Sequence, residues 1–371
     1  MKEIIEWFDL LKTEKDKNKI KKIVEEFDLS SYISSNEDMK NLLELAYNNI
    51  LNMDIQYVPY ILDSLYVSEN KGKFYLFCYL LEKTYERLPF ITNLEQYSIH
   101  REKFKMFLPT LIEVASNTMN GICDCMFLIL LKFVQDKDLF TNEQIEKLTQ
   151  IIEEQLAIIT QYLKNNEFNL NEMQENSLNI LLDVSSNFFN KAITYQTIFI
   201  MSFIKSNSVR LWAAISLIKN NIDLKESVLE DIAADITLVS DLLRLLEKNN
   251  CINKFPEKFK NQEIIAKSIL IKWLMYPTEL GKVPNEIELI ETIEKEGYLY
   301  YIYKFSTDIE VYKDKNWMLG ISGGFKKEDF TAQNTGITFS KFETVTQDFL
   351  KQGNELIEFI MNYWKERAKK L

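Results

Sequence analysis

The sequence predicts a mainly α-helical fold: an α-solenoid of antiparallel helix pairs over residues 1–296, then a small antiparallel β element and a final helix over residues 297–371. Apolar residues recur at helical spacing between short polar loops in the first part. Gly72 and Gly121 are the only glycines before position 280, whereas the rest of the 9 glycines follow it. After Gly297 the apolar period changes from helical to two, which is typical of strands.

The predicted helices are separated by polar or glycine-containing segments. Thr141 and Gln144 form a capping box that predicts where one long helix starts. Pro109 predicts an interruption in another helix, because proline cannot donate a backbone hydrogen bond. One or two short helices are expected over residues 3–27. Further helices are expected over 73–87, 92–118, 122–135, 141–163, 171–189, 194–205, 206–221 and 261–276, and another is expected from Ser240.

The character of the chain changes after Pro277, which ends the 261–276 helix. We expect a short helix over residues 285–296, capped by Gly297. Strands are expected over 298–305, 316–322 and 336–342, with turns at Gly323–Gly324 and Gly336. A last helix over 346–369 carries an apolar stripe. Sheet and helix together are expected to cover the open end of the helical stack.

The helix pairs recur every ~35–45 residues, which is the range of HEAT-like repeats. No strict repeat is visible in the sequence, so a compact, irregular helical domain stays open as the alternative architecture.

A set of residues between positions 260 and 345 carries a resemblance to a known family. These residues are Trp273–Leu274, Pro277, Glu279–Leu280–Gly281, Pro284, Ile287–Glu288, Trp317–Met318–Leu319–Gly320 and Thr338–Phe339–Ser340–Lys341–Phe342. Together they resemble the C-terminal part of a group of bacterial HEAT-like repeat proteins. The resemblance implies a binding role, including that of immunity-type proteins that neutralise toxins, and it implies no catalytic residues.

Composition restricts the partner and the compartment. The net charge of −11 and the pI of about 5.0 disfavour binding to nucleic-acid phosphates and favour a basic protein partner. Glu3, Glu6 and Asp9 interrupt the apolar N-terminus, so we expect no signal peptide. No apolar run reaches the ~20 residues of a membrane span. With the 4 cysteines interpreted as reduced, we expect a cytoplasmic protein.

The sequence offers little reactive chemistry. The sequence contains 1 histidine, His100, which disfavours a histidine metal site or a catalytic triad. We therefore expect no cofactor and no metal. The stretch Gly320–Gly324 lacks the ending of a phosphate-binding loop. Asp308, Glu310 and Asp314 lack the glycine-centred spacing of a calcium loop. Glu279 is open to either a structural or a functional role.

The candidate contact surface is the outward face of the tyrosine-rich strand, with Tyr298, Tyr300 and Ile302, to which we add Glu279 and Trp317. We expect a non-enzymatic module that binds another protein, and an immunity-type protein that neutralises a bacterial toxin is the class we expect. Two alternatives stay open: a HEAT-like enzyme that processes nucleic-acid bases, which would require a basic binding face, and a scaffold within a larger complex.

Overall fold

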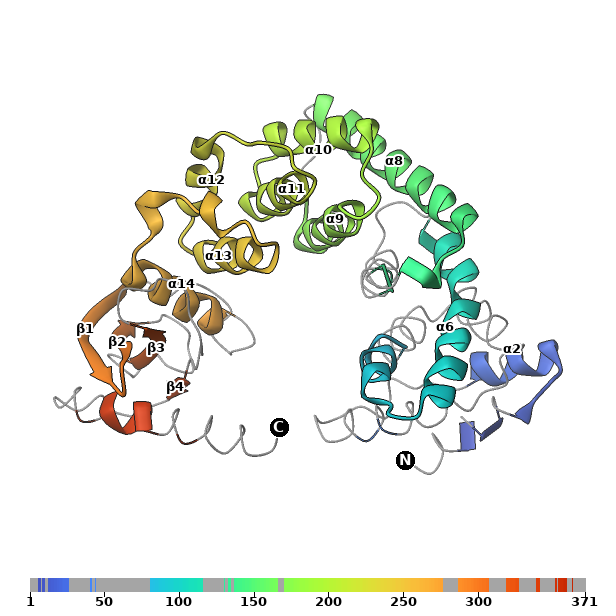
Figure 1. Ribbon diagram of the computed structural model, residues 1–371, viewed down its shortest axis with the longest axis horizontal. Helices are drawn as coiled ribbons and strands as arrows, with labels where there is room; N and C mark the ends of the chain where they lie inside the picture. Colours follow the sequence, from blue (N-terminus) through green and yellow to red (C-terminus); the bar gives the residue numbers. More distant parts are fainter. Residues whose placement is uncertain are drawn as a thin grey trace. The chain divides into compact units, whose positions relative to one another are not determined.

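The computed structural model describes residues 6–7, 9–10, 13–26, 41, 44, 81–115, 130, 133–134, 137–165, 170–275, 286–306, 318–326, 338–340, 351, 353–358 and 362. Within these residues the chain is mainly helical, with one antiparallel sheet near the C-terminus (Figure 1). By compactness the chain divides into two units, Met1–Ile222 and Asp223–Leu371. The division expected at 296/297 falls instead in the turn between two paired strands.

The described elements of the first unit are α2 (Lys17–Glu26), η2 (Leu88–Phe90), α6 (Leu94–Ala115), η3 (Lys137–Leu139), α8 (Asn142–Lys164), α9 (Glu172–Ser185), α10 (Lys191–Phe203) and α11 (Asn207–Lys219). Those of the second unit are α12 (Glu226–Ala233), α13 (Val239–Lys248), η4 (Ile252–Lys254), η5 (Glu257–Phe259), α14 (Gln262–Met275), β1 (Glu286–Lys295), β2 (Tyr298–Ser306), β3 (Met318–Lys326) and β4 (Thr338–Ser340).

Side-chain caps set where the helices of the first unit begin. The backbone amide of Gln144 donates to Thr141 Oγ1 at 3.2 Å, and the Thr141 amide donates to Gln144 Oε1 at 2.9 Å, so the predicted capping box of α8 is confirmed. Asn171 and Gln174 form the same reciprocal pair at the start of α9. Each box satisfies two amides that have no partner within the helix.

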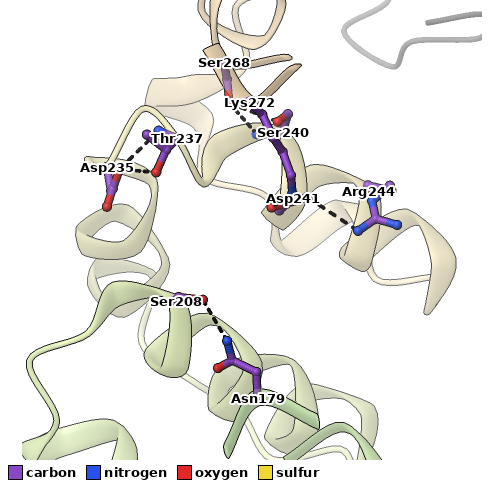
Figure 2. Close-up of polar contacts among 9 residues, drawn as sticks. All are labelled: Asn179, Ser208, Asp235, Thr237, Ser240, Asp241, Arg244, Ser268 and Lys272. Atoms are coloured by element: carbon purple, nitrogen blue, oxygen red, sulfur yellow. Dashed lines mark hydrogen bonds and ion pairs between the residues drawn. The ribbon is translucent and has the colours of Figure 1, made fainter. Parts of the chain in front are cut away.

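In the first unit, a helix packs against the helix two positions later in the chain as well as against the next one. α8 packs against α10, and α9 packs against α11, while α10 also contacts α11 (Figure 1). Buried leucine and isoleucine side chains fill these contacts. Polar links join α9 to α11. Asn179 Nδ2 donates to Ser208 Oγ at 2.9 Å (Figure 2). Ser216 Oγ donates to the Leu182 carbonyl. These links fix α9 and α11 in register with each other.

The prediction that Pro109 interrupts its helix is wrong, because α6 continues through Pro109 from Leu94 to Ala115. Proline withholds a hydrogen bond from the preceding turn. However, Phe104, Phe107 and Leu108 before it, and Leu111 and Ile112 after it, are all buried. Packing on both sides of the proline therefore holds one helix where local preference favours two.

The sheet of the second unit has 4 antiparallel strands in the order β1-β2-β3-β4. The three predicted strands correspond to β2, β3 and β4. The prediction of a short helix over residues 285–296 is wrong, because Glu286–Lys295 forms the strand β1. Glu296 and Gly297, with φ of 54° and 80°, make the tight turn to β2. Positive φ at both central residues matches the right-handed twist of a two-residue hairpin.

A β-bulge explains why β1 has the appearance of a helix in the sequence. Leu289 lies opposite Tyr303 and Glu291 lies opposite Ile302, so Ile290 is an extra residue. The extra residue shifts the alternation by one position. Apolar residues on either side of it are then no longer two apart, which obscures the strand pattern.

The prediction of a turn at Gly323–Gly324 is wrong, because these glycines form a second β-bulge within a continuous strand. Tyr300 lies opposite Gly323 and Leu299 lies opposite Phe325, which makes Gly324 the extra residue within β3. Glycine is common at such positions because it tolerates the distorted backbone. The strand therefore continues to Lys326 instead of turning back.

Both faces of the sheet are covered within the second unit. On one face, α14 packs against β3, and the side chains of Leu270 and Phe305 both lie against Gly320. On the other face, Leu356 and Ile357 pack with Tyr300, Ile302, Leu319 and Ile321. Residues 353–358 are helical, which confirms the final helix in this part of the chain.

Polar contacts join α13 to α14 (Figure 2). The Ser240 amide donates to the buried Ser268 Oγ at 3.0 Å, and Ser268 Oγ donates to Ser240 Oγ at the same distance. Asp241 forms ion pairs with Lys272 of α14 and with Arg244 of its own helix.

Candidate protein-binding surface

The tyrosine-rich strand does not provide the exposed face that we expected. Tyr300 and Ile302 are buried, at 6% and 0% exposure, and Tyr298 is half-buried against the same cluster. The expectation fails because residues 353–358 cover this face, and α14 covers the opposite one. Glu279 and Trp317 lie outside the described residues.

The neighbouring tyrosines have a structural role. Tyr303 Oη donates to the Glu263 carbonyl and Tyr301 Oη donates to Gln262 Oε1, both at 3.1 Å, which ties β2 to α14. Burial, followed by the nearby Glu263 carboxylate, raises the pKa of both phenols. The hydroxyls therefore stay protonated and keep donating these hydrogen bonds.

Of the groups considered for chemistry, His100 belongs to the first unit and Cys251 to the second, while Asp308, Glu310 and Asp314 lie outside the described residues. His100 is half-buried on α6, and burial, then Lys103, lowers the pKa of its imidazole. Cys251 is half-buried and reduced. In the described part of the chain, no three His, Cys, Asp or Glu side chains gather as they would around a metal ion. None of the helices described there combines the length and apolarity needed to cross a bilayer.

Large apolar side chains are exposed on η2 and α6 (Phe90, Leu94, Ile99 and Met106) and also on α8 and α10, and we name the second of these surfaces the α8–α10 outer face. Tyr195 and Phe203 are both 60% exposed, and Tyr162 is 49% exposed. Exposed aromatic side chains in such number are typical of protein contact sites. The residues of the α8–α10 outer face are Ile158, Tyr162, Tyr195, Ile198, Phe199 and Phe203.

The aromatic side chains of α10 form one row. Tyr195, Phe199 and Phe203 are spaced four residues apart, which places them on one side of the helix. The rings of Phe199 and Phe203 stack with centroids 4.3 Å apart, and those of Tyr195 and Phe199 are 6.5 Å apart. Lys164 Nζ, from the end of α8, lies 5.4 Å from the Phe199 ring centroid. The cation is attracted by the ring face and extends the row to α8.

The opposite side of α10 anchors the row. Ile193, Thr197 and Ile200 are buried beneath it. At one end Asn190 Nδ2 donates to Glu153 Oε1 of α8 at 2.6 Å, and at the other end Lys164 meets Phe199. These two contacts follow the same order along both helices, so α8 and α10 run parallel. The aromatic side chains are thus held on a preformed support, which reduces the entropy lost on binding.

Charged residues surround the α8–α10 outer face unevenly. Glu143, Glu146 and Glu154 are exposed on α8, together with Lys147. Lys164 lies at the other end of the helix. Carboxylates therefore predominate at the N-terminal end of α8, and the aromatic row lies toward its C-terminal end.

This surface was not predicted from the sequence, although one signal was present. The segment KAITYQTIFIMSF is apolar on most sides, and a helix of that kind is ordinarily interpreted as buried. The position of the second helix row, which decides the buried side, is tertiary information. The exact four-residue spacing of three aromatic residues was the available signal. No protein-family model matches this sequence, and no curated protein matches it.

Proposed function

We propose that this chain is a non-enzymatic protein-binding module, and that the α8–α10 outer face is its contact surface. The single observation that carries the proposal is the row of Tyr195, Phe199 and Phe203, anchored from below and exposed above. Tyrosine and other aromatic side chains supply large contact area at small entropic cost, and they dominate interface hot spots.

An α-solenoid of stacked helix pairs is the architecture we propose for the helical part. The contacts of α8 with α10 and of α9 with α11 support it, because stacked hairpins bring each helix against its counterpart in the next pair. In such a stack, one row of helices presents a continuous face to a partner.

The partner that the charge favours is a basic protein, and a toxin neutralised by binding is the class we propose. The net charge of −11 repels nucleic-acid phosphates and attracts cationic proteins. A toxin that acts on nucleic acid commonly carries a cationic surface, which binding to an acidic protein would occupy.

Affinity capture tests the proposal. Wild-type protein and the Tyr195→Ala/Phe203→Ala variant are immobilised, and partners captured from the native cell extract are identified by mass spectrometry at low and high salt. We expect a basic protein on the wild-type chain at low salt, less at high salt, and little on the variant. Equal recovery on both proteins, with circular dichroism showing that the variant is folded, contradicts the assignment of the surface.

A further inference from the structure

We propose that the outer edge of β1 binds a basic, extended peptide segment of a partner protein as an additional strand. β1 is a 10-residue strand at one end of the strand order, with β2 on its other side. Among the described residues, no strand pairs with its outer edge (Figure 1). An edge strand directs alternate backbone amides and carbonyls outward, and a further strand can pair with them.

Side chains already occupy two backbone groups of β1. The Thr292 amide donates to Glu291 Oε1 at 3.3 Å, and the Ile287 carbonyl accepts from Lys267 Nζ at 3.4 Å. Both contacts are long, and both partners are ends of flexible side chains. A carbonyl of an incoming strand can replace the Glu291 carboxylate, which is then available to a cationic side chain of the same strand.

The charge of the edge selects the partner. Glu286, Glu288 and Glu291 share the face of the sheet on which residues 353–358 lie, because their cross-strand neighbours Ser306, Lys304 and Ile302 do. Glu294 lies on the opposite face, opposite Leu299. All four glutamates are exposed, so carboxylates flank the edge on both sides. Lysine or arginine at alternate positions of an added strand would lie beside them.

Two lysines near the edge form ion pairs that offset only part of this negative charge. Lys304 pairs with Glu288 at 2.8 Å, and Lys295 pairs with Glu358 at 2.9 Å. Glu358 of the final helix is itself exposed, and its ion pair with Lys295 places its carboxylate next to the edge. A second copy of this chain would set one row of glutamates against another, which opposes self-association. The edge therefore favours a basic segment over a copy of itself.

The β-bulge at Ile290 limits where an added strand can pair with β1. Ile290 divides β1 into a segment before it, where Lys267 already contacts Ile287, and the regular segment 291–295 after it. We assign the added strand to residues 291–295 because its ladder is uninterrupted there.

Three synthetic peptides test the proposal on the full chain. The probe is a ten-residue peptide of alternating lysine and threonine. The first control carries N-methyl groups on alternate amides, which keeps the charge and removes strand pairing. The second control replaces lysine with glutamate. Dissociation constants are measured by fluorescence anisotropy, and amide exchange in β1 is followed by hydrogen–deuterium exchange mass spectrometry.

We expect the lysine peptide to protect amides of residues 291–295, the N-methylated peptide to bind at least about tenfold more weakly, and the glutamate peptide not to bind. The double substitution Glu291→Gln/Glu294→Gln should weaken binding of the lysine peptide and leave the fold unchanged. Equal binding of the two lysine peptides, or no protection in β1, overturns strand addition. Tyr195→Ala/Phe203→Ala serves as the independent control, because loss of the α8–α10 outer face should leave peptide binding intact.

Discussion

The backbone of Gly353 lies directly against the side chain of Ile302, so that a Cβ atom at position 353 would overlap the Ile302 Cδ1 methyl. Ile302 is fully buried and belongs to β2, whereas Gly353 belongs to the final helix. This close approach is what lets the helix cover the sheet face on which Tyr300 lies.

Gly353→Ala should destabilise the protein by about 1–2 kcal/mol. Overpacking costs about 1–3 kcal/mol, and the gain in helix propensity of about 1 kcal/mol offsets part of it. Urea unfolding measures the change. The matched background is Ile302→Val, which removes the overlapping methyl. There the alanine should be neutral or stabilising, and an equal loss in both backgrounds contradicts the packing.

Ser268→Ala should lower the free energy of unfolding by about 1–2 kcal/mol, because it leaves the Ser240 amide at the start of α13 without its acceptor. The control is Ser202→Ala, since the exposed Ser202 hydroxyl only donates to the Ile198 carbonyl of its own helix. That variant should stay within about 0.5 kcal/mol of wild type. Comparable losses from the two variants would show that the link between α13 and α14 adds nothing.

Tyr195→Ala should change stability by less than about 1 kcal/mol, and Phe203→Ala should lose no more than the stacking of one aromatic pair, about 0.5–1.5 kcal/mol. Phe107→Ala, in the buried face of α6, should cost about 3–5 kcal/mol. Thermal unfolding distinguishes these classes. A loss at Tyr195 as large as that at Phe107 would identify the row as core instead of contact surface.

Acid should weaken the fold through His100. Burial, then Lys103, lowers the pKa of this imidazole below its ordinary value of 6.5, so the unfolded chain binds the proton more readily. Its contribution to stability is complete above pH 6.5 and is lost as the pH falls through the lowered pKa.

The control for this prediction is His100→Gln, which removes the only histidine while keeping the titrating carboxylates. Urea unfolding of both proteins at several pH values between about 7.5 and 5 isolates the histidine. The stability of wild type should fall more steeply toward low pH. Parallel curves for the two proteins would contradict the lowered pKa.

Local chemistry made much of the fold predictable. The capping residues Thr141 and Gln144 locate the start of α8, and the two-residue period of 298–305 identifies β2, because both signals depend on neighbours in sequence. β1 was missed because Ile290 breaks its alternation. The glycine pair of β3 was assigned to a turn because a bulge and a turn use the same residue.

The contact surface was harder to predict than the elements. Tyr300 and Ile302 look half-exposed when β2 is considered alone, and only the packing of residues 353–358 buries them. Conversely, Tyr195 and Phe203 look like core residues until the position of α8 and α11 fixes the buried side of α10. Exposure is a property of tertiary packing, so the sequence predicted a buried face as the contact surface and did not predict the exposed one.

The most direct test is the dissociation constant of the purified partner for wild-type protein and for Tyr195→Ala/Phe203→Ala, by titration calorimetry. Hot-spot aromatics each contribute about 2 kcal/mol or more, so the double variant should bind at least about a hundredfold more weakly while its unfolding stays cooperative. An unchanged dissociation constant in a folded variant would contradict the claim that this protein acts through the aromatic row of α10.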